Sequence, residues 1–282
     1  MMVQITNRCR MGCPHCLDAA TPDGGLMDEA TFGNALRFAK DNQCPILTIS
    51  GGEPSEHPLF LDFCKRTSRA GLIFGIATNG MWLGDQSAEW RMERIAKLKG
   101  FAGAQVYTNP KWYRLHGETI SKYRAQESRW TSLNVNLETA EIRNMIDLGR
   151  ARDCPEAMAE VRASKYHCSC LACHVTAVQS HNMSHFLHLM VMQQRLCTPL
   201  IDWRGDFHAS ESWLCQSFGN VNKDDGWAIF ERLKSGRPCG RCLSCRKYLS
   251  EDSPKMEMAR KLLGQEKIKL QEEENADDER AS

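Results

Sequence analysis

The sequence lacks an excess of charge of either sign and any long hydrophobic run. Its 282 residues carry 36 Lys and Arg against 35 Asp and Glu, which excludes the strong field of a typical nucleic-acid-binding protein. No apolar stretch approaches the length needed to span a bilayer. The N-terminus shows no charged segment followed by a long apolar one, so we expect no signal peptide. These features predict a cytoplasmic protein with no membrane partner and no strong nucleic-acid signal.

Cysteine, by contrast, is abundant, with 14 residues. In a reducing compartment such cysteines indicate metal ligands rather than disulfides. Cys9, Cys13 and Cys16 follow the spacing CxxxCxxC directly after a short apolar N-terminal stretch. Three cysteines leave one iron of an iron-sulfur cluster open to a non-protein ligand, which indicates chemistry rather than a closed structural site. The alternatives are a zinc knuckle and ordinary buried thiols.

Two further motifs follow predicted strands. Gly51, Gly52 and Glu53 come directly after the apolar stretch 46–49, and Thr78 and Asn79 come after the stretch 72–76. Loops at the carboxyl ends of parallel strands carry the functional groups of α/β barrels, so the three motifs are expected at one mouth. The two glycines predict a close backbone approach to a ligand, with Glu53 as acceptor for an ammonium group. The alternative is a plain turn.

Strands and helices alternate along the first half of the sequence. Helices are predicted over 28–40, 58–69, 87–99 and 138–151, and strands over 103–107 and 133–137, with a less distinct strand near 157–163. Alternation of this kind predicts an α/β fold with a parallel sheet that curls into a full or partial barrel.

The three motifs together resemble the signature of the radical S-adenosylmethionine (radical SAM) enzymes. The resemblance implies a partial (β/α)6 TIM-like barrel and a catalytic 4Fe-4S cluster held by Cys9, Cys13 and Cys16. It also implies S-adenosylmethionine as cosubstrate, reductively cleaved to a 5′-deoxyadenosyl radical that abstracts hydrogen from the substrate. An external electron donor such as flavodoxin or ferredoxin is then required.

The resemblance also assigns residues to S-adenosylmethionine. Glu53, with the backbone of Gly51 and Gly52, would hold its amino group, and His15 would lie against the adenine. Further contacts are expected from strand ends, at Thr78, Asn79, Tyr107, Asn109, Asn134 and Asn136. For the two asparagines at 134 and 136, a solvated strand face is the alternative.

A second cysteine set lies in the C-terminal third, at Cys197, Cys215, Cys239, Cys242 and Cys245. The segment 202–206 between the first two is turn-like and suited to a hairpin. The set resembles the auxiliary-cluster modules called twitch and SPASM, and its short cysteine series favours the one-cluster twitch form, with a second 4Fe-4S cluster. A structural zinc site on the same residues is the alternative.

Other cysteines and histidines lie between the two sets. Cys168, Cys170 and Cys173 precede a predicted helical segment that carries His181, His185 and His188 on one face. One interpretation is another metal site, to which Cys154 is a candidate ligand. The other is a set of buried thiols beside a polar histidine stripe, and this second interpretation is favoured. A thiol that acts in catalysis is a third alternative.

The sequence thus divides into three predicted parts. Residues 1–165 form the barrel, 166–250 the cysteine-rich module, and 251–282 a helical and then acidic, disordered tail. The predicted function is hydrogen abstraction from a peptide or protein for oxidative modification or cross-linking. The alternatives are a small-molecule radical dehydrogenase acting on a sugar or alcohol, a glycyl-radical activating enzyme, and a zinc-binding interaction protein.

Overall fold

The computed structural model of the chain describes residues 1–106, 118, 133–135, 148–163, 170–192, 199–210 and 212–236. Its centre is one eight-stranded sheet with the order β5-β4-β3-β2-β1-β6-β7-β8. The strands are β1 (Met2–Gln4), β2 (Leu47–Ser50), β3 (Phe74–Thr78), β4 (Phe101–Val106), β5 (Leu133–Val135), β6 (Leu200–Ile201), β7 (Asp206–His208) and β8 (Ser217–Asn220). The six strands from β5 to β6 pair in parallel, and β7 and β8 pair antiparallel. The predicted α/β fold with a mostly parallel sheet is confirmed.

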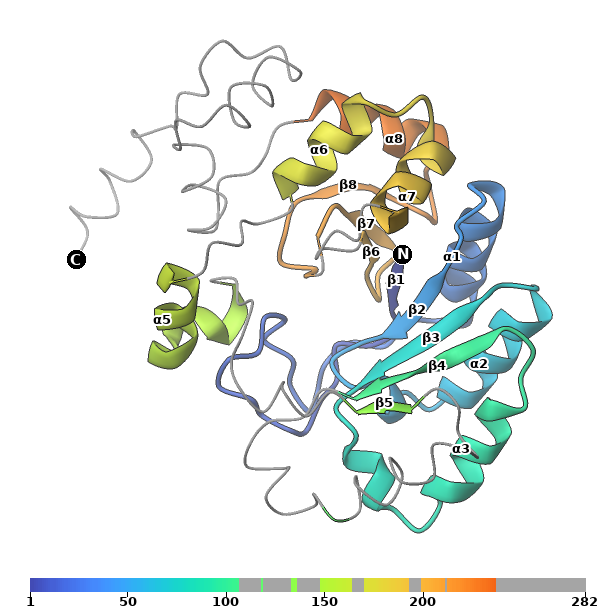
Figure 1. Cartoon of the computed structure of the whole chain (residues 1–282), viewed down its shortest axis with the longest axis vertical. Coiled ribbons are helices and arrows are strands. Elements are labelled where there is room, and N and C mark those ends of the chain that lie inside the picture. The colour runs from blue at the N-terminus through green and yellow to red at the C-terminus, as the bar shows by residue number, and fades with distance from the viewer. Residues whose placement is uncertain are drawn as a thin grey trace.

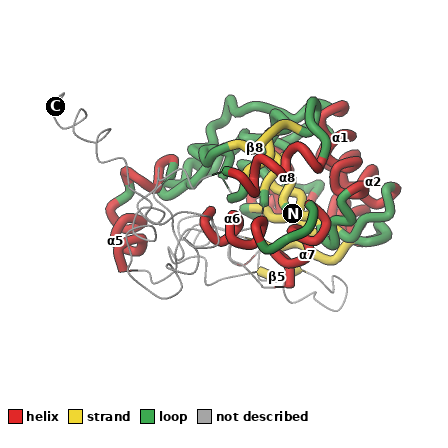
Figure 2. The backbone as a smooth tube through the Cα atoms, turned by 90° about the horizontal axis from the view of Figure 1, so that it is seen from above, coloured by secondary structure: helices red, strands yellow, loops and turns green. Residues whose placement is uncertain are grey.

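The helices fall into groups around this sheet (Figure 1). They are α1 (Glu29–Asp41), α2 (Phe60–Arg69), α3 (Ala88–Ala96), α5 (Pro155–Ala163), α6 (Cys170–Val178), α7 (Met183–Met192) and α8 (Gly226–Ser235). Short 3₁₀ helices are η1 (Pro54–Glu56), η2 (Met81–Gly84) and η4 (Gly149–Asp153). Helices α1 to α3 cover one face of the parallel strands, whereas α6, α7 and α8 lie together beside β7 and β8; α5 stands apart (Figures 1 and 2).

A capping residue and buried aromatic rings explain why α1 and α2 form where the sequence predicts helices. Asp28 caps α1, because its Oδ1 accepts a hydrogen bond from the Thr31 amide at 2.7 Å. Phe32 of α1 and Phe63 of α2 stack with ring centroids 3.9 Å apart in the apolar core under the sheet. These buried rings hold two neighbouring helices against one face of the sheet. The strand ends carry the functional loops.

The register of the sheet sorts side chains into two rows at its carboxyl edge. One row faces the helices and is fully apolar: Ile201, Val3, Ile49, Ile76 and Ala104. The adjacent positions on the opposite face form a second row: Asp202, Gln4, Ser50, Ala77 and Gln105. Successive residues of a strand point to opposite faces, so the second row lies on the sheet face away from α1 to α3, the concave face of the half-barrel. Except at Ala77 this row is polar, and Asp202, Gln4 and Ser50 are buried.

Two sequence predictions are corrected by the fold. Residues 155–163 form helix α5 and not a sixth strand, because Ala157 and Val161 are buried at helical spacing after a proline that suits a first turn. The sixth parallel strand is β6, which pairs with β1. Within the predicted helix 138–151, the described part begins at Leu148 and enters the 3₁₀ turn η4, since Gly149 has a φ of +53°.

The predicted hairpin around 202–206 is confirmed, since β6 and β7 pair antiparallel across it. The sheet therefore continues from the parallel strands into residues 200–220, and the division into a barrel and a second module at residue 165 stays a prediction. Within the described residues, no helix combines the length and apolar character needed to cross a bilayer.

Candidate active site

The segment between β1 and α1 is a loop that carries all three N-terminal cysteines. Its two arms run beside each other, with the Cys9 amide donating to the Thr21 carbonyl at 2.9 Å and the Asn7 amide to the Gly25 carbonyl at 2.9 Å. Cys9 is buried, whereas Cys13 and Cys16 are half-buried. We call residues 6–27 the cysteine loop. It leaves the carboxyl end of β1, where functional loops of parallel α/β proteins lie.

The Gly51–Glu53 segment packs directly on the backbone of the cysteine loop. The Gly52 amide donates to the Thr6 carbonyl at 2.7 Å, and the Glu53 amide to the Arg8 carbonyl at 2.8 Å. A Cβ at Gly52 would lie 2.6 Å from the Arg8 carbonyl oxygen, and one at Gly51 would lie 2.8 Å from that of Thr6. The glycines thus permit a close approach of two backbones. This is a different reason from the ligand approach that the sequence predicted.

Glu53 connects this segment to the third motif. Its Oε1 accepts hydrogen bonds from the Thr78 hydroxyl at 2.7 Å and the Ser55 amide at 3.0 Å, and its Oε2 accepts from the Asn79 amide at 2.7 Å. The side-chain amide of Asn79 in turn reaches Cys9 Sγ at 3.5 Å. Thus the structure brings the three motifs together, as the sequence predicted.

The electrostatics of Glu53 bear on its predicted role. Burial raises the pKa of its carboxyl group, and the hydrogen bonds from Ser55, Asn79 and Thr78 partly offset that rise. Ser55 contributes with both its side chain and its backbone, so four hydrogen bonds lie on a carboxylate with roughly four acceptor positions. The assignment of Glu53 to an ammonium group stays a proposal.

Two residues far along the chain hold the second half of the cysteine loop. Arg150 of η4 donates from Nε to the Cys13 carbonyl at 2.9 Å and from a terminal nitrogen to the Ala20 carbonyl at 2.8 Å. Trp213 donates from Nε1 to the Asp18 carbonyl at 3.0 Å. Neither residue belongs to a recognisable motif, and sequence reasoning missed both. Only the tertiary fold places them against the loop.

Burial disfavours the charged form of the Cys9 and Cys16 thiols, and backbone hydrogen bonds partly offset this effect. Burial raises the pKa of Cys9 to about 11 and also raises the pKa of Cys16, on which Arg150 acts in the opposite direction. Burial, with a contribution from the Arg150 charge, lowers the pKa of His15, so its ring is favoured in the neutral form. A coordinating metal would reverse the preference of the thiols, because a bound thiol is deprotonated outright.

Three cysteine thiols on one loop are a donor set that suits an iron-sulfur cluster. In the described part of the chain, the one trio of metal-type donors whose ligand atoms lie within 4.8 Å of one another is Asp202, Asp206 and His208. Thiolates with an amide donor near one sulfur are typical of cluster ligands.

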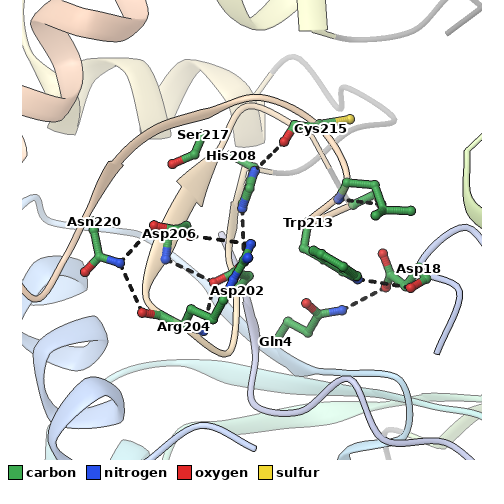
Figure 3. Close-up of polar contacts among 12 residues, drawn as sticks. Gln4, Asp18, Asp202, Arg204, Asp206, His208, Trp213, Cys215, Ser217 and Asn220 are labelled. Atoms are coloured by element: carbon green, nitrogen blue, oxygen red, sulfur yellow. Dashed lines mark hydrogen bonds and ion pairs between the residues drawn. The ribbon is translucent and has the colours of Figure 1, made fainter. Parts of the chain in front are cut away.

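The trio at the β6–β7 hairpin is already neutralised by Arg204 (Figure 3). The guanidinium lies 2.7 Å from Asp202 and 3.4 Å from Asp206, and it stacks on Trp213 with its carbon 5.1 Å from a ring centroid. Burial alone would raise the pKa of Asp202, but hydrogen bonds from His208 and Arg204 lower it overall. This arrangement is an ion-pair network that supports Trp213 rather than a metal site.

Several predicted residues lie outside the described part: Tyr107, Asn109, Asn136, Cys168, Cys197, Cys239, Cys242 and Cys245. Of the C-terminal set, Cys215 is described. It follows Trp213 by two residues, and its carbonyl lies 3.0 Å from Nδ1 of His208. The segment that carries Cys215 is therefore fixed close to the cysteine loop. Whether Cys215 binds a metal stays a prediction.

The histidines in and near α7 lie at or near the protein surface. His181 and His185 stack with centroids 5.0 Å apart, and His188 is exposed. His181 precedes the helix, which begins at Met183. Among the residues the structure describes, these histidines contribute to no trio of metal donors. Cys173 is fully buried in the core, as the favoured interpretation of buried thiols expects.

Residues 3–111 match the family model described as the Radical SAM superfamily. This segment contains the cysteine loop, the Gly51–Glu53 segment and the Thr78–Asn79 strand end. Through this match, residues 3–111 are assigned to the radical SAM superfamily of enzymes. The assignment implies a 4Fe-4S cluster and S-adenosylmethionine, and the three thiols of the cysteine loop suit the cluster.

Curated relatives match a similar N-terminal part. A tungsten-containing aldehyde ferredoxin oxidoreductase cofactor-modifying protein from Pyrococcus furiosus is 34% identical over 89 residues, which are 30% of this chain and 25% of that protein. A PqqA peptide cyclase from Ruegeria pomeroyi is 29% identical over 85 residues, 29% of this chain and 23% of that protein. The matches thus span about a quarter of the relatives' length.

Solved structures give weaker similarity over more of the chain. SuiB of Streptococcus suis, bound to precursor peptide SuiA, aligns with a TM-score of 0.49 and 14% identity over 90% of this chain and 73% of SuiB. The protein anSMEcpe with bound AdoMet aligns with a TM-score of 0.44 and 11% identity. The alignment covers 82% of this chain and 80% of anSMEcpe.

Substitution Gly52→Ala tests the docking of the second motif on the cysteine loop. The added methyl group meets backbone, which cannot rotate away, so we expect a loss of about 1–3 kcal/mol in the free energy of unfolding. Anaerobic denaturant titration of the cluster-free protein measures it. The control Gly33→Ala, on α1, faces only the end of Arg66 and should change stability by no more than about 1 kcal/mol, in the stabilising direction. Equal stability of both variants would contradict the docking.

Substitution Arg150→Ala tests the clamp on the loop. It removes two charge-assisted hydrogen bonds to loop carbonyls, which should cost about 2–4 kcal/mol of stability. It also removes a charge that lowers the pKa of Cys16, so that pKa rises and cluster reconstitution shifts to higher pH.

The exposed neighbour Arg152→Ala is the matched control. Iron incorporation against pH, measured in parallel, should be unchanged in that variant. An unshifted profile in the Arg150 variant would refute a role for its charge.

Proposed function

We propose that this chain reductively cleaves S-adenosylmethionine at a cluster bound by Cys9, Cys13 and Cys16, and uses the product to abstract hydrogen from a peptide or protein. The observation that supports this proposal best is the convergence of the three motifs. Glu53 accepts hydrogen bonds from Thr78 and Asn79, and Asn79 donates to Cys9. When bound, the cluster supplies an electron, and S-adenosylmethionine supplies the 5′-deoxyadenosyl group.

The chain's own residues would bind and orient these groups. The buried carboxylate of Glu53 would attract the amino group of S-adenosylmethionine by its charge, with the carbonyls of Gly51 and Gly52 beside it. His15 is half-buried, its Nδ1 has no hydrogen-bond partner, and burial and Arg150 favour its neutral form. A neutral aromatic ring with a free nitrogen suits stacking against adenine. Tyr107, Asn109, Asn134 and Asn136 remain candidates for the ribose and carboxylate.

The concave face of the sheet supports a polar substrate. Gln105 and Ala77 of the second row are partly exposed, whereas the apolar row behind them is buried. Gln105 thus offers a partly exposed polar side chain on this face, with which a polar substrate can form hydrogen bonds. The name of one relative, a peptide cyclase, supports a peptide or protein substrate and a cross-linking or oxidative outcome.

An auxiliary 4Fe-4S cluster on the second cysteine set is the other part of the proposal. Cys215 would be one ligand, with others from Cys197, Cys239, Cys242 and Cys245. The supporting observation is that the segment 212–216 is held against the cysteine loop by Trp213 and Ser212, the latter donating to the Leu17 carbonyl at 3.3 Å. A cluster there would lie beside the active site, where it could accept an electron from a substrate radical.

The test is a comparison of variants after anaerobic reconstitution. In the variant Cys9→Ala, Cys13→Ala and Cys16→Ala, we expect 5′-deoxyadenosine formation to fall below detection and about half of the iron to be lost, because a second cluster remains. Replacement of Cys239, Cys242 and Cys245 should remove the other half. The control Cys44→Ala changes a buried core thiol and should retain both. Zinc in place of iron, with no 5′-deoxyadenosine from the wild type, would overturn the proposal.

A further inference from the structure

Five of the eight described buried side-chain atoms without a hydrogen-bond partner belong to the segment 4–18. They are Gln4 Oε1, Asn7 Oδ1, Arg8 Nε, His15 Nδ1 and Asp18 Oδ1. A buried polar atom left without a partner costs about 1–3 kcal/mol, so native proteins retain few of them. Such a concentration in one segment indicates a surface completed by a ligand.

Gln4 and Asp18 form a defined pair within this group (Figure 3). Gln4 Nε2 donates to Asp18 Oδ2 at 2.8 Å, and Gln4 is only 1% exposed. This bond fixes the orientation of the amide, because the flipped amide would place its oxygen against the carboxylate. Gln4 Oε1 and Asp18 Oδ1 are then both acceptors, and neither has a donor. A ligand that completes this pair must donate hydrogen bonds.

The nearby positive charges are engaged elsewhere. Arg204 is directed at Asp202 and Asp206, and Arg150 at the carbonyls of the cysteine loop. His208 faces Asp202 and the Cys215 carbonyl. Among the described residues, the donors to the Asp18 carboxylate are neutral: the Gln4 amide, the Trp213 backbone and the Ser212 hydroxyl, which also lies 3.3 Å from the Leu17 carbonyl. The charge of His208 acts on Asp18 without a hydrogen bond. A buried carboxylate that no cationic group contacts directly favours a cationic donor.

Position sets this pair apart from the residues assigned to S-adenosylmethionine. Gln4 stands in the polar row between Asp202 of β6 and Ser50 of β2, on the concave face. Asp18 lies beyond Cys16, on the part of the loop held by Trp213. The pair thus borders the hairpin side of the mouth, where β6 and the segment 212–216 form the wall.

We propose that Gln4 and Asp18 form a substrate subsite that binds a cationic nitrogen group, such as a lysine ammonium or an arginine guanidinium of a peptide. The inference rests on the proposed function for the identity of its occupant as substrate. Charge-assisted hydrogen bonds to Asp18 Oδ1 and a second bond to Gln4 Oε1 would satisfy both acceptors. The pair would then help select the residue presented to the cysteine loop.

The probes are n-butylguanidinium and its neutral isostere n-butylurea, which offer similar N–H donors but differ in charge. Their dissociation constants are measured by ligand-observed NMR on the reconstituted enzyme with S-adenosylmethionine bound. We expect the guanidinium to bind at least about tenfold more tightly, because a charge-assisted hydrogen bond exceeds a neutral one by that factor or more. In Asp18→Asn this preference should disappear. The exposed Asp23→Asn, in the same loop, is the control and should keep it.

Three other results of this experiment would overturn the proposed subsite. Equal affinity of the two probes for the wild type would mean that water completes the pair. Persistence of the preference in Asp18→Asn would place the cation elsewhere. A dissociation constant for S-adenosylmethionine that rises about tenfold in Asp18→Asn would assign the pair to that molecule's own ammonium group. Failure of the wild type to form 5′-deoxyadenosine would refute the proposed function separately, since probe binding does not depend on cleavage.

Discussion

The active site depends on the close contact between the Gly51–Glu53 segment and the backbone of the cysteine loop. Two amide-to-carbonyl hydrogen bonds join these segments, at a separation that a side chain on either glycine would prevent. The contact places Glu53 where it accepts from Thr78 and Asn79, and Asn79 then reaches Cys9. The geometry of three strand ends is therefore set by one backbone approach, with a buried carboxylate as its centre.

The same loop is supported from the opposite side by the later part of the chain. Arg150 and Trp213 donate to carbonyls at Cys13, Ala20 and Asp18, and Trp213 is itself held by stacking with Arg204. Amides within the loop bind some of its carbonyls, including those of Thr21 and Gly25, and the distant donors bind further ones and stabilise the loop. As a consequence, the environment of Cys9, Cys13 and Cys16 depends on the β6–β7 hairpin as well as on the parallel strands.

The sequence predicted the parts of the site that follow from local rules. The spacing of Cys9, Cys13 and Cys16, and the strand ends at Glu53 and Asn79, could be recognised because each motif follows an apolar strand. Arg150, Trp213 and the Gln4–Asp18 pair could not, because their role arises from contacts between residues distant in sequence or from strand register. The strand predicted near 157–163 was wrong because its apolar residues fit helical spacing equally well, and β6 was missed because two residues are too few for a periodic pattern.

The central claim is that the three N-terminal cysteines bind a cluster with an iron open to S-adenosylmethionine. It is tested most directly by the electron paramagnetic resonance spectrum of the reduced cluster in a variant that lacks Cys239, Cys242 and Cys245, recorded with and without S-adenosylmethionine. The account predicts one cluster signal whose g-values shift when S-adenosylmethionine is added. A signal that S-adenosylmethionine leaves unchanged, or a protein that contains zinc and no iron, would contradict it.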